Sequence, residues 1–575
     1  MILQALKEYY DRKPDLPRQG WEMKAIPFLV VINTDGRFVG FQDTRENNDA
    51  KQFLVPALGE KKGRGIKSNL FWENIEYMLG IPVPTKAKPN PNIGRVKMQH
   101  LAFRKKIESV IGDHPFLIAA RNFATIGQHS SVERDPLWPE VLKTNQILLL
   151  SMQAMGPLTD NSEVRTLVDV SHKASDSRCI CLVTGNEDEM NLLEPPIKGV
   201  RDANTSGACL VGFQKYSGYD SFGKKQGTNA PIGKSASFAY TTALNTLLRK
   251  NSPQKLQIGD ATTVFWSAQP TKLETDVFFF FNAPPKGNPD RNTDAVKSIY
   301  ASIWNGSYVI PDDNTLFYLL GLAPNSARIA VRFWEVDTVS KIGRRLQQHV
   351  KDLAIVNKDH NSSLPLRNLL RSVAAQHEDK NIPSNLAGNT VRSIIEGLPY
   401  PQTLLQCAIR RIKAEQASNK KTGKSAQNVT YERAALIKAC INRSMRFNNH
   451  NYEKEITMSL DTTNTNVGYR LGRLFAVLER IKERANPGNA TICDHFYGAA
   501  SETPVTVFGN LMRLKNHHLS KLKNAGERIN LEKLIGEIMS EIYDFPARLP
   551  LANQGRFAIG YYHQKQDFFT KKTDK

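Results

Sequence analysis

The sequence predicts an α+β fold, in which antiparallel strands are mixed with helices in the first part of the chain and helices alone form the rest. Three patterns lead to this prediction. Residues 27–41 have the pattern of a β-hairpin, because an apolar run and an alternating run flank the turn sequence NTDG. Several further short apolar runs are typical of strands. Beyond residue 341 the apolar residues recur at helical spacing.

Residues 1–345 are expected to form the mixed α+β N-terminal portion, which opens with a short amphipathic helix. Helices are predicted near 70–79, where Ser68 or Asn69 is suited to be the N-cap, and near 98–111. A Pro-rich, cationic segment at residues 81–92 separates them.

The middle of this portion is predicted to combine strands with two helices. One helix covers residues 234–250, and the other covers 312–323 and stops at a glycine and a proline. Five apolar runs are predicted as strands: 179–185, 207–213, 262–268, 275–281 and 327–336.

Two all-helical parts are predicted to follow. Residues 346–450 form a basic helical region, and residues 451–575 form a C-terminal helical bundle. In the bundle, two sets of apolar residues have the spacing of one buried helix face. They are Leu471, Leu474, Phe475, Leu478 and Ile481, and then Leu531, Leu534, Ile535, Ile538 and Ile542.

The chain is strongly basic, and its excess charge is concentrated. Its 575 residues include 77 Lys or Arg and 56 Asp or Glu, a formal net charge of +21. Residues 61–106 have a net charge of +9 and residues 405–450 one of +8, so these two stretches supply 17 of the 21 charges. Focused charge of this kind favours a polyanionic partner, either nucleic acid or an anionic membrane.

A reducing, cytoplasmic setting is expected. The N-terminus has no apolar leader, and the six cysteines do not make a disulfide framework. Cys179 and Cys181 lack a second close pair, so a zinc site would need a distant ligand such as Cys209, and buried thiols are the simpler interpretation.

Motifs for catalysis are weak. Residues 227–235, GTNAPIGKS, have one residue too many for a phosphate-binding loop, and Pro231 removes an amide donor. Asp15, Glu22 and Lys24 are the residue types of a metal-dependent nuclease, but a loop-forming stretch separates the two acids. The chain is therefore expected to bind rather than to catalyse, without a cofactor or metal, and a nuclease remains the alternative.

The stretch GRGIKSNLFWEN, residues 63–74, is a candidate binding loop. Its two glycines permit backbone conformations that other residues avoid, and the apolar LFW that follows is expected to be buried and to hold the loop in place. The alternative is a surface turn that caps the next helix. The candidate binding side chains are Arg64, Lys67, Ser68 and Asn69.

Several stretches, taken in order, resemble one family. They include MILQALKEYYDR at the N-terminus, GIKSNLFWENIEYMLG at 65–80, CICLVTGNEDE at 179–189, the long stretch 197–248, and ERAALIKACINR at 432–443. TTVFWSA and LGLAPNSARIAVRFW lie between the last two. This order is similar to that of the large subunit of the type I-C CRISPR surveillance complex, called Cascade.

The resemblance implies a function in antiviral defence. Such a subunit reads the short protospacer-adjacent motif on duplex DNA, promotes unwinding and R-loop formation, and holds the displaced strand, while a separate helicase-nuclease that it recruits cuts the DNA. The implied partners are guide RNA, target double-stranded DNA, the backbone and small Cascade subunits and, transiently, the helicase-nuclease, with no membrane. A structural scaffold that contacts only RNA is a further alternative.

The resemblance also implies site residues. Asn69 is the expected base contact, its amide donating to minor-groove acceptors, while Lys67 and Arg64 hold phosphates. A second, flexible loop is expected to enter a groove or to wedge the duplex, unless it is merely solvated. Its candidates are Lys224, Lys225, Gln226 and Asn229. Gln269, at a strand end where the family's pattern more often has an acid, is a separate candidate.

Other basic residues are candidates for guide RNA or strand phosphates. Arg328 and Arg332 are expected on one face of a strand, where structural ion pairs are the alternative. The remaining candidates, for which a solvated face is the alternative, are Arg410, Arg411, Lys413, Lys420, Lys421, Lys424, Arg513, Lys515, Lys521 and Lys523.

In this family, small subunits are made from an internal start in the same gene. Met458 opens the predicted bundle and would give a product of 118 residues, 458–575. Lys454-Glu455 can be encoded by a purine-rich run at a suitable distance upstream, and Met445 is a weaker rival inside a predicted helix.

Overall fold

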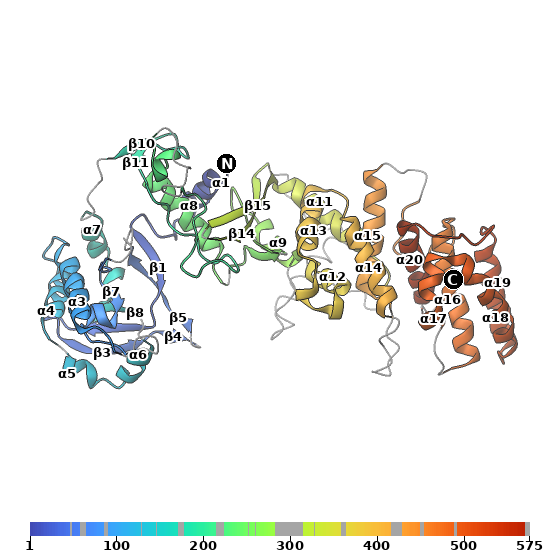
Figure 1. Cartoon of the computed structure of the whole chain (residues 1–575), viewed down its shortest axis with the longest axis horizontal. Coiled ribbons are helices and arrows are strands. Elements are labelled where there is room, and N and C mark those ends of the chain that lie inside the picture. The colour runs from blue at the N-terminus through green and yellow to red at the C-terminus, as the bar shows by residue number, and fades with distance from the viewer. Residues whose placement is uncertain are drawn as a thin grey trace. The chain divides into compact units, whose positions relative to one another are not determined.

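The computed structural model describes most of the chain, which divides into two compact units. Unit 1 consists of Met1–Ile197 and Cys209–Asn245, and unit 2 of Lys198–Ala208 and Thr246–Lys575. Strands mixed with helices are followed by a long all-helical part, which confirms the predicted α+β fold (Figure 1). The described residues are 1–46, 49–57, 65–84, 90–127, 129–144, 147–170, 177–213, 223–250, 252–258, 260–281, 314–326, 328–357, 364–415, 428–448, 454–487 and 492–569.

A mixed sheet with the order β3-β2-β8-β7 is the centre of unit 1. β2 (Phe28–Ile32) and β3 (Phe38–Asp43) form the predicted hairpin. β2 also pairs in parallel with β8 (Ile147–Met152), which pairs antiparallel with β7 (Trp72–Asn74) and with β9 (Gly156–Pro157). β8 has the sequence ILLLSM, the continuous apolar run of a strand that is buried on both faces.

Helices complete the core of unit 1, where Phe103 and Phe116 join the buried side chains of β2 and β8. The predicted helix near residue 70 begins only at Ile75, because residues 72–74 pair with β8. Its N-cap is Asn74, whose side chain accepts from the Tyr77 amide, and not Ser68 or Asn69. The helices are α1 (Ile2–Asp11), α2 (Ile75–Met78), α3 (Ile93–Glu108), α4 (Pro115–Thr125), α5 (His129–Glu133), α6 (Trp138–Thr144), α7 (Ser162–Val170) and α8 (Lys234–Leu247).

Three small antiparallel pairs lie outside the main sheet. They are β1 (Trp21–Ala25) with β6 (Gln52–Pro56), β4 (Arg45–Glu46) with β5 (Asp49–Ala50), and β10 (Arg178–Ile180) with β11 (Glu187–Glu189). The strand predicted at 179–185 is therefore shorter than expected. The described run at 207–213 contains isolated bridge residues and no strand.

A four-stranded antiparallel sheet opens unit 2. Its order is β12 (Lys255–Ile258), β13 (Ala261–Ser267), β14 (Leu316–Asn325) and β15 (Arg328–Thr338). The predictions of strands at 262–268 and 327–336 are confirmed. The helix predicted at 312–323 is wrong, because this continuous apolar run is the inner strand β14, buried between β13 and β15.

The strand predicted at 275–281 is also wrong. These residues belong to helix α9 (Leu273–Phe281). The carboxylate of Glu274, in the first turn, accepts from the backbone N–H of Ser267 at 2.8 Å and also from its hydroxyl, so the helix start is tied to the end of β13. Tertiary contacts thus override the β-propensity of the phenylalanine run.

Helices form the rest of unit 2 and share one hydrophobic core with its sheet, from Leu256 to Tyr562. The predicted division at residues 345 and 450 stays a prediction. The helices are α11 (Val339–Leu353), α12 (Leu366–Val373), α13 (Ser384–Glu396), α14 (Gln402–Glu415), α15 (Tyr431–Phe447), α16 (Val467–Ala485), α17 (Ile492–Glu502), α18 (Phe508–Ser520), α19 (Ala525–Met539) and α20 (Leu551–Asp567).

Glycines let α16 and α20 approach closely. A Cβ atom on Gly472 would lie 2.0 Å from the carbonyl oxygen of Phe557, and one on Gly560 would lie 2.1 Å from that of Tyr469. Only a hydrogen fits at these two positions, so the backbones of the two helices are in direct contact.

Candidate nucleic-acid interface

The first candidate loop is anchored by buried apolar residues, as the sequence predicts. Leu70, Phe71 and Trp72 are all buried. Phe71 has a φ of 66°, and its carbonyl accepts from the Leu150 amide at 3.0 Å. The indole N–H of Trp72 donates to the carbonyl of Pro56 at 2.8 Å. The end of the loop is thus fixed to the central sheet and to the strand pair beside it.

Asn69 is held inside the protein by Glu73. Only 3% of Asn69 is exposed. Its backbone N–H and its side-chain Nδ2 both donate to Glu73 Oε1, at 3.2 and 2.8 Å. Glu73 Oε2 accepts from the Asn74 amide at 3.1 Å, so both carboxylate oxygens are engaged. The side-chain oxygen of Asn69 is buried and accepts no hydrogen bond from any described residue.

This arrangement changes the expected chemistry of Asn69. Glu73 Oε1 accepts from both nitrogens of Asn69, so the amide nitrogen faces Glu73 and the amide oxygen points away from it. One N–H of the amide is therefore already used, and the free group is an acceptor. A side chain expected to donate to base edges is arranged chiefly to accept.

The other residues of this loop differ in exposure. Ser68 is buried, and its hydroxyl donates to the carbonyl of Asn69 at 3.0 Å. Lys67 is exposed, so it is accessible to a phosphate. Arg64 lies outside the described residues.

The second candidate loop is folded onto the β10–β11 hairpin. The Gly227 amide donates to the carbonyl of Leu192 at 3.1 Å, and the Leu182 amide donates to that of Pro231 at 3.0 Å. Within the loop, Asn229 Nδ2 donates to the Gln226 carbonyl at 2.9 Å. The side chain of Asn229 therefore stabilises the fold of the loop. The side chains of Lys224 and Lys225, at the start of the loop, are exposed.

Acidic side chains occupy the positions at which a phosphate-binding loop would hold phosphate. Asp188 accepts from the backbone N–H of Ser235 at 3.0 Å and from its hydroxyl, and Glu189 forms an ion pair with Lys234. The loop at 227–235 thus leads into α8, as the simpler interpretation of its sequence predicts.

The regular alternation of side chains along β15, on which the prediction for Arg328 and Arg332 depends, is interrupted. The pairing register between β14 and β15 shifts at Gly321/Leu322, which leaves Arg332 without a partner residue in the ladder. The strict alternation that placed Arg328 and Arg332 on one face is therefore broken. Arg332 forms an ion pair with Asp260 at 3.0 Å, which agrees with the structural alternative. Gln269 is exposed after the end of β13.

Three of the described cations of the basic stretch at 405–450 lie inside the protein. Arg433, Lys438 and Arg443 are buried. Lys413 forms an ion pair with Glu502 at 2.8 Å, while Arg410 is exposed. Much of the positive charge of α15 is therefore internal, because this helix faces the core on most sides. Lys420, Lys421 and Lys424 lie outside the described residues.

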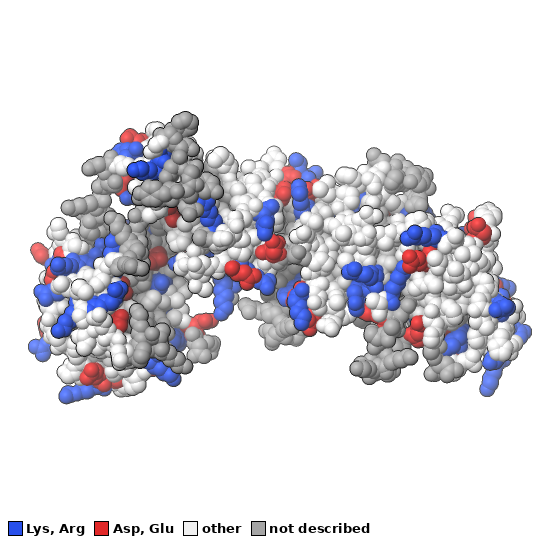
Figure 2. Space-filling model, in the orientation of Figure 1, with Lys and Arg blue, Asp and Glu red and all other residues white. Residues whose placement is uncertain are grey.

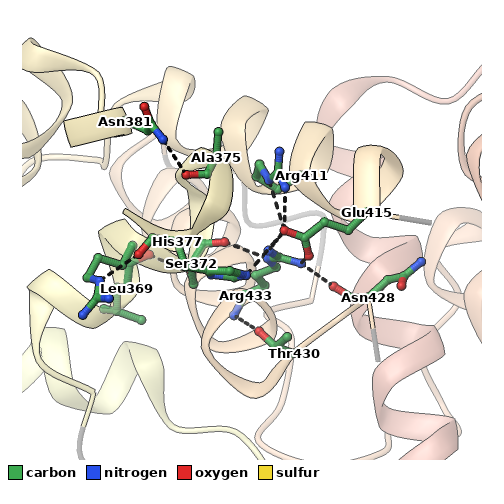
Figure 3. Close-up of polar contacts among 11 residues, drawn as sticks. Leu369, Ser372, Ala375, His377, Asn381, Arg411, Glu415, Asn428, Thr430 and Arg433 are labelled. Carbon is green, nitrogen blue, oxygen red and sulfur yellow. Dashed lines mark hydrogen bonds and ion pairs between the residues drawn. The ribbon is translucent and has the colours of Figure 1, made fainter. Parts of the chain in front are cut away.

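Arg433 and Glu415 are the centre of this internal network (Figure 3). The guanidinium of Arg433 is fully buried and donates to both carboxylate oxygens of Glu415, at 2.5 and 2.8 Å. It also donates to the carbonyls of Ser372 and Asn428. Burial raises the pKa of Glu415, but the hydrogen bonds and charges of Arg433 and Arg411 outweigh this effect and lower it. Arg411 is thus engaged in a structural ion pair.

The basic residues of α18 and the turn after it remain candidates for phosphate contacts. Arg513, Lys521 and Lys523 are exposed and Lys515 is half-buried, and none of the four forms an ion pair with a described residue. On the face drawn in Figure 2, basic and acidic side chains are interspersed over much of the surface.

The residues of the nuclease alternative lie near the start of unit 1. Glu22 and Lys24 share one face of β1, where the Lys24 ammonium lies 5.3 Å from the centre of the Trp72 ring, and Asp15 lies in a turn. In the described part of the chain, no group of three or more His, Cys, Asp or Glu side chains is arranged to hold a metal ion. No described helix has both the length and the apolar character needed to cross a bilayer.

Sequence reasoning missed the two acids that organise these sites. Glu73 stands in the apolar run LFWEN, and Glu415 ends a helix beside several cations. A carboxylate within a buried run signals a specific internal partner, since an unpaired buried charge is costly.

Comparison with known proteins identifies the family. The sequence matches the family described as CRISPR-associated protein (Cas_Csd1) over residues 6–569, nearly the whole chain. No curated protein gives a match. The matched region includes both candidate loops and the C-terminal helices, and it supports the resemblance to a subunit of Cascade. The chain therefore belongs to the CRISPR-associated Cas_Csd1 family.

Proposed function

We propose that this protein is the large subunit of a type I-C Cascade. In this proposal it recognises the protospacer-adjacent motif on duplex DNA, promotes unwinding and R-loop formation, holds the displaced strand and recruits the helicase-nuclease. It acts in the cytoplasm with guide RNA and with the backbone and small subunits, and it breaks no bonds itself.

The buried amide oxygen of Asn69 is the observation that carries motif recognition. A buried acceptor without a donor is costly, and a binding partner that supplies the donor removes this cost. The loop that bears Asn69 also bears the exposed Lys67, which is suited to a phosphate. Because Asn69 is buried, contact with a base edge requires the residues that cover it to move aside.

The test compares the assembled complex on duplexes that differ only in the adjacent motif. Asn69→Ala should weaken binding to a motif-bearing duplex by about tenfold, since one good base contact contributes about 1–3 kcal/mol. Binding to a duplex without the motif should change by less than about twofold. Equal losses on both duplexes would refute a role in motif recognition. Thermal melting of the variant checks that it is folded.

The nuclease alternative is tested with the purified protein. Incubation with DNA and Mg²⁺ or Mn²⁺ should give no cleavage. Cleavage that Glu22→Gln abolishes would make the protein an enzyme and overturn the proposal. For the alternative of a scaffold that contacts only RNA, the expected result is equal binding to duplexes with and without the motif.

A further inference from the structure

Most of the described positive charge of the stretch 61–106 lies on one helix. This stretch contains eleven Lys or Arg, and the structure describes six of them. Lys67 belongs to the first candidate loop, and the other five are on α3: Arg95, Lys97, Arg104, Lys105 and Lys106. The charge of α3 is therefore a separate feature of unit 1, which the proposed motif recognition does not use.

One side of α3 packs against the rest of unit 1, and the opposite side is exposed. The buried residues are Val96, Gln99, Phe103 and Ile107. Leu101 lies on the opposite side and is 47% exposed. Because each residue turns the helix by about 100°, Lys97, Met98 and Lys105 lie within about 60° of Leu101. Met98 is 55% exposed, and both lysines are exposed. We call Lys97, Met98, Leu101 and Lys105 the Leu101 face.

The positive charge of the Leu101 face is not cancelled. Arg104, which is also next to Leu101, forms an ion pair with Glu108 at 2.8 Å. Lys97 and Lys105 form no ion pair with a described residue. These two lysines are separated by about 12 Å along the helix axis, and Leu101 lies midway between them. The face therefore presents an aliphatic centre flanked by two positive charges.

Several kinds of occupant fit this face poorly. A second copy of the same face would bring lysines against lysines. A phosphate backbone would match the lysines but would leave Met98 and Leu101 without an apolar partner. A bilayer requires a broad apolar face, whereas here a lysine lies one turn away from Leu101 on either side. A fitting occupant must supply both an apolar contact and carboxylates.

We propose that the Leu101 face docks an acidic helical segment of another protein. In the segment that fits, an aliphatic residue stands between two Asp or Glu residues at positions i, i+4 and i+8, the spacing of Lys97, Leu101 and Lys105. The aliphatic side chain packs on Leu101 and Met98, which are neighbours one turn apart, and each carboxylate pairs with one lysine. Charge complementarity selects acidic segments over basic ones. The inference goes beyond the proposed function and does not depend on it.

The test measures binding of a synthetic peptide to the purified full-length chain. The peptide is alanine-rich, helical and labelled with fluorescein, and it carries glutamate, leucine and glutamate at positions i, i+4 and i+8. Fluorescence anisotropy at low salt gives its affinity. We expect the wild-type chain to bind it, and Leu101→Ser to weaken binding by about tenfold, because burial of the leucine is lost. A wild-type chain that does not bind the peptide would refute the inference.

Charge reversal tests the lysines against a matched control. Lys97→Glu/Lys105→Glu should weaken binding of the acidic peptide by at least about tenfold, because two attractive pairs become repulsive. Arg95→Glu/Lys106→Glu changes the net charge of the same helix equally, but these positions lie about 120° and 140° from Leu101 around the helix axis. This control should lose less than about twofold. Equal losses in the two double variants would show that only the general positive charge of the chain attracts the peptide, and the inference would fail.

A charge-swapped peptide keeps the test valid if the variant is suspected of misfolding. With lysine in place of both glutamates, the peptide should bind Lys97→Glu/Lys105→Glu and should not bind the wild-type chain. Recovery of binding in this pair supports direct contact between the lysines and the carboxylates. If the swapped peptide binds neither protein while thermal melting shows that the variant is folded, the proposed pairing is wrong.

Two further probes test the other occupants. They are a duplex DNA and vesicles that contain phosphatidylglycerol, and Leu101→Ser should change the binding of neither. A loss of vesicle binding in Leu101→Ser, with peptide binding unchanged, would make the face a membrane contact. A larger loss of duplex binding than of peptide binding in Lys97→Glu/Lys105→Glu would make it a phosphate contact. Either result would overturn the inference.

Discussion

Glu73 Oε1 accepts a hydrogen bond of 2.8 Å from the side-chain nitrogen of Asn69, four residues before it in the chain. Both groups are buried, and the same carboxylate oxygen accepts from the backbone N–H of Asn69. These two hydrogen bonds orient the side-chain amide of Asn69, with its nitrogen towards Glu73 and its oxygen away from it. When the loop moves aside to let DNA reach Asn69, this side chain presents its amide oxygen as an acceptor, because one N–H of its amide nitrogen is already bonded to Glu73.

This orientation predicts the base that Asn69 reads. In the minor groove the guanine 2-amino group is the only donor that a base pair presents. Inosine lacks this group. Replacing guanine by inosine at one motif position should therefore weaken binding of the wild-type complex by about tenfold. In the Asn69→Ala complex, the same replacement should have no further effect.

The Glu73→Ala variant tests the orientation itself. Without the carboxylate the amide of Asn69 can rotate, so discrimination between guanine and inosine should decrease.

The inosine experiment also has an outcome that would contradict the role of Asn69. An inosine penalty of the same size in the Asn69→Ala complex would show that another group reads the guanine 2-amino group.

Arg433 is predicted to be essential for the stability of unit 2. Arg433→Met leaves the carboxylate of Glu415 and two backbone carbonyls without their donor. Loss of one partner of a buried ion pair costs about 3–5 kcal/mol, so the free energy of unfolding in urea should fall by about this amount. Arg411→Met is the control, because it removes a partly exposed pair on the same carboxylate and should cost less than about 1 kcal/mol. Similar losses in both variants would contradict this account.

Two Gly→Ala substitutions should have opposite effects on stability, because only one of the two glycines lies at the contact between α16 and α20. Gly472→Ala forces a methyl group against the backbone of α20 and should destabilise the protein by about 2–3 kcal/mol. At Gly536 on α19 a Cβ atom would meet nothing within 4 Å. Gly536→Ala should therefore stabilise the protein by up to about 1 kcal/mol, since alanine is the better helix former. Thermal unfolding measures both effects, and a neutral Gly472→Ala would show that the helices separate easily.

Two buried histidines predict a loss of stability in acid. Burial lowers the pKa of both His349 and His563 to about 3, and the nearby positive charges of Arg443 and Lys438 add to this effect. In the unfolded chain these groups take up protons near pH 6.5. The folded state is therefore penalised increasingly as the pH falls from about 6.5 towards 3. Each histidine should reduce the free energy of unfolding by about 1.4 kcal/mol per pH unit in this range.

Urea unfolding at several pH values between 7 and 4.5 measures this slope. His349→Gln and His563→Gln should each make the slope shallower by about 1.4 kcal/mol per pH unit. The acidic residues contribute equally in all three proteins, so the difference between slopes isolates the histidines. Identical slopes would mean that the histidines are accessible to protons in the folded state.

Local patterns were sufficient where one face of an element is buried. The hairpin at 27–41 and the helices of the second half have clear periods of 2 and 3.6 residues, and the structure contains them. The patterns were less reliable for elements buried on both faces: β13 was predicted correctly, but two other strands were not. The inner strand β14 has a continuous apolar sequence that does not distinguish a strand from a helix, and β8, at the centre of the first sheet, was not predicted at all.

The chemistry of the candidate site could be predicted only in part. The sequence indicates the loop at 63–74 and its apolar anchor, because both are local. It does not show that Glu73 turns back onto Asn69, or that three cations of the stretch 405–450 face the core. Both depend on tertiary packing, which decides whether a charged residue meets solvent or an internal partner.

Met458 provides a prediction about the gene rather than the fold. If a small subunit starts at this residue, changing its codon to one for leucine should remove a product of 118 residues and leave the full chain intact. The full chain should tolerate the change, because the residue is 56% exposed and its backbone carbonyl, which the substitution leaves in place, accepts from the Val356 amide at 2.8 Å. Immunoblotting against the C-terminal helices measures both products. The same change at Met445, which is buried in α15, is the comparison, and an undiminished short product after the change at Met458 would place the start elsewhere.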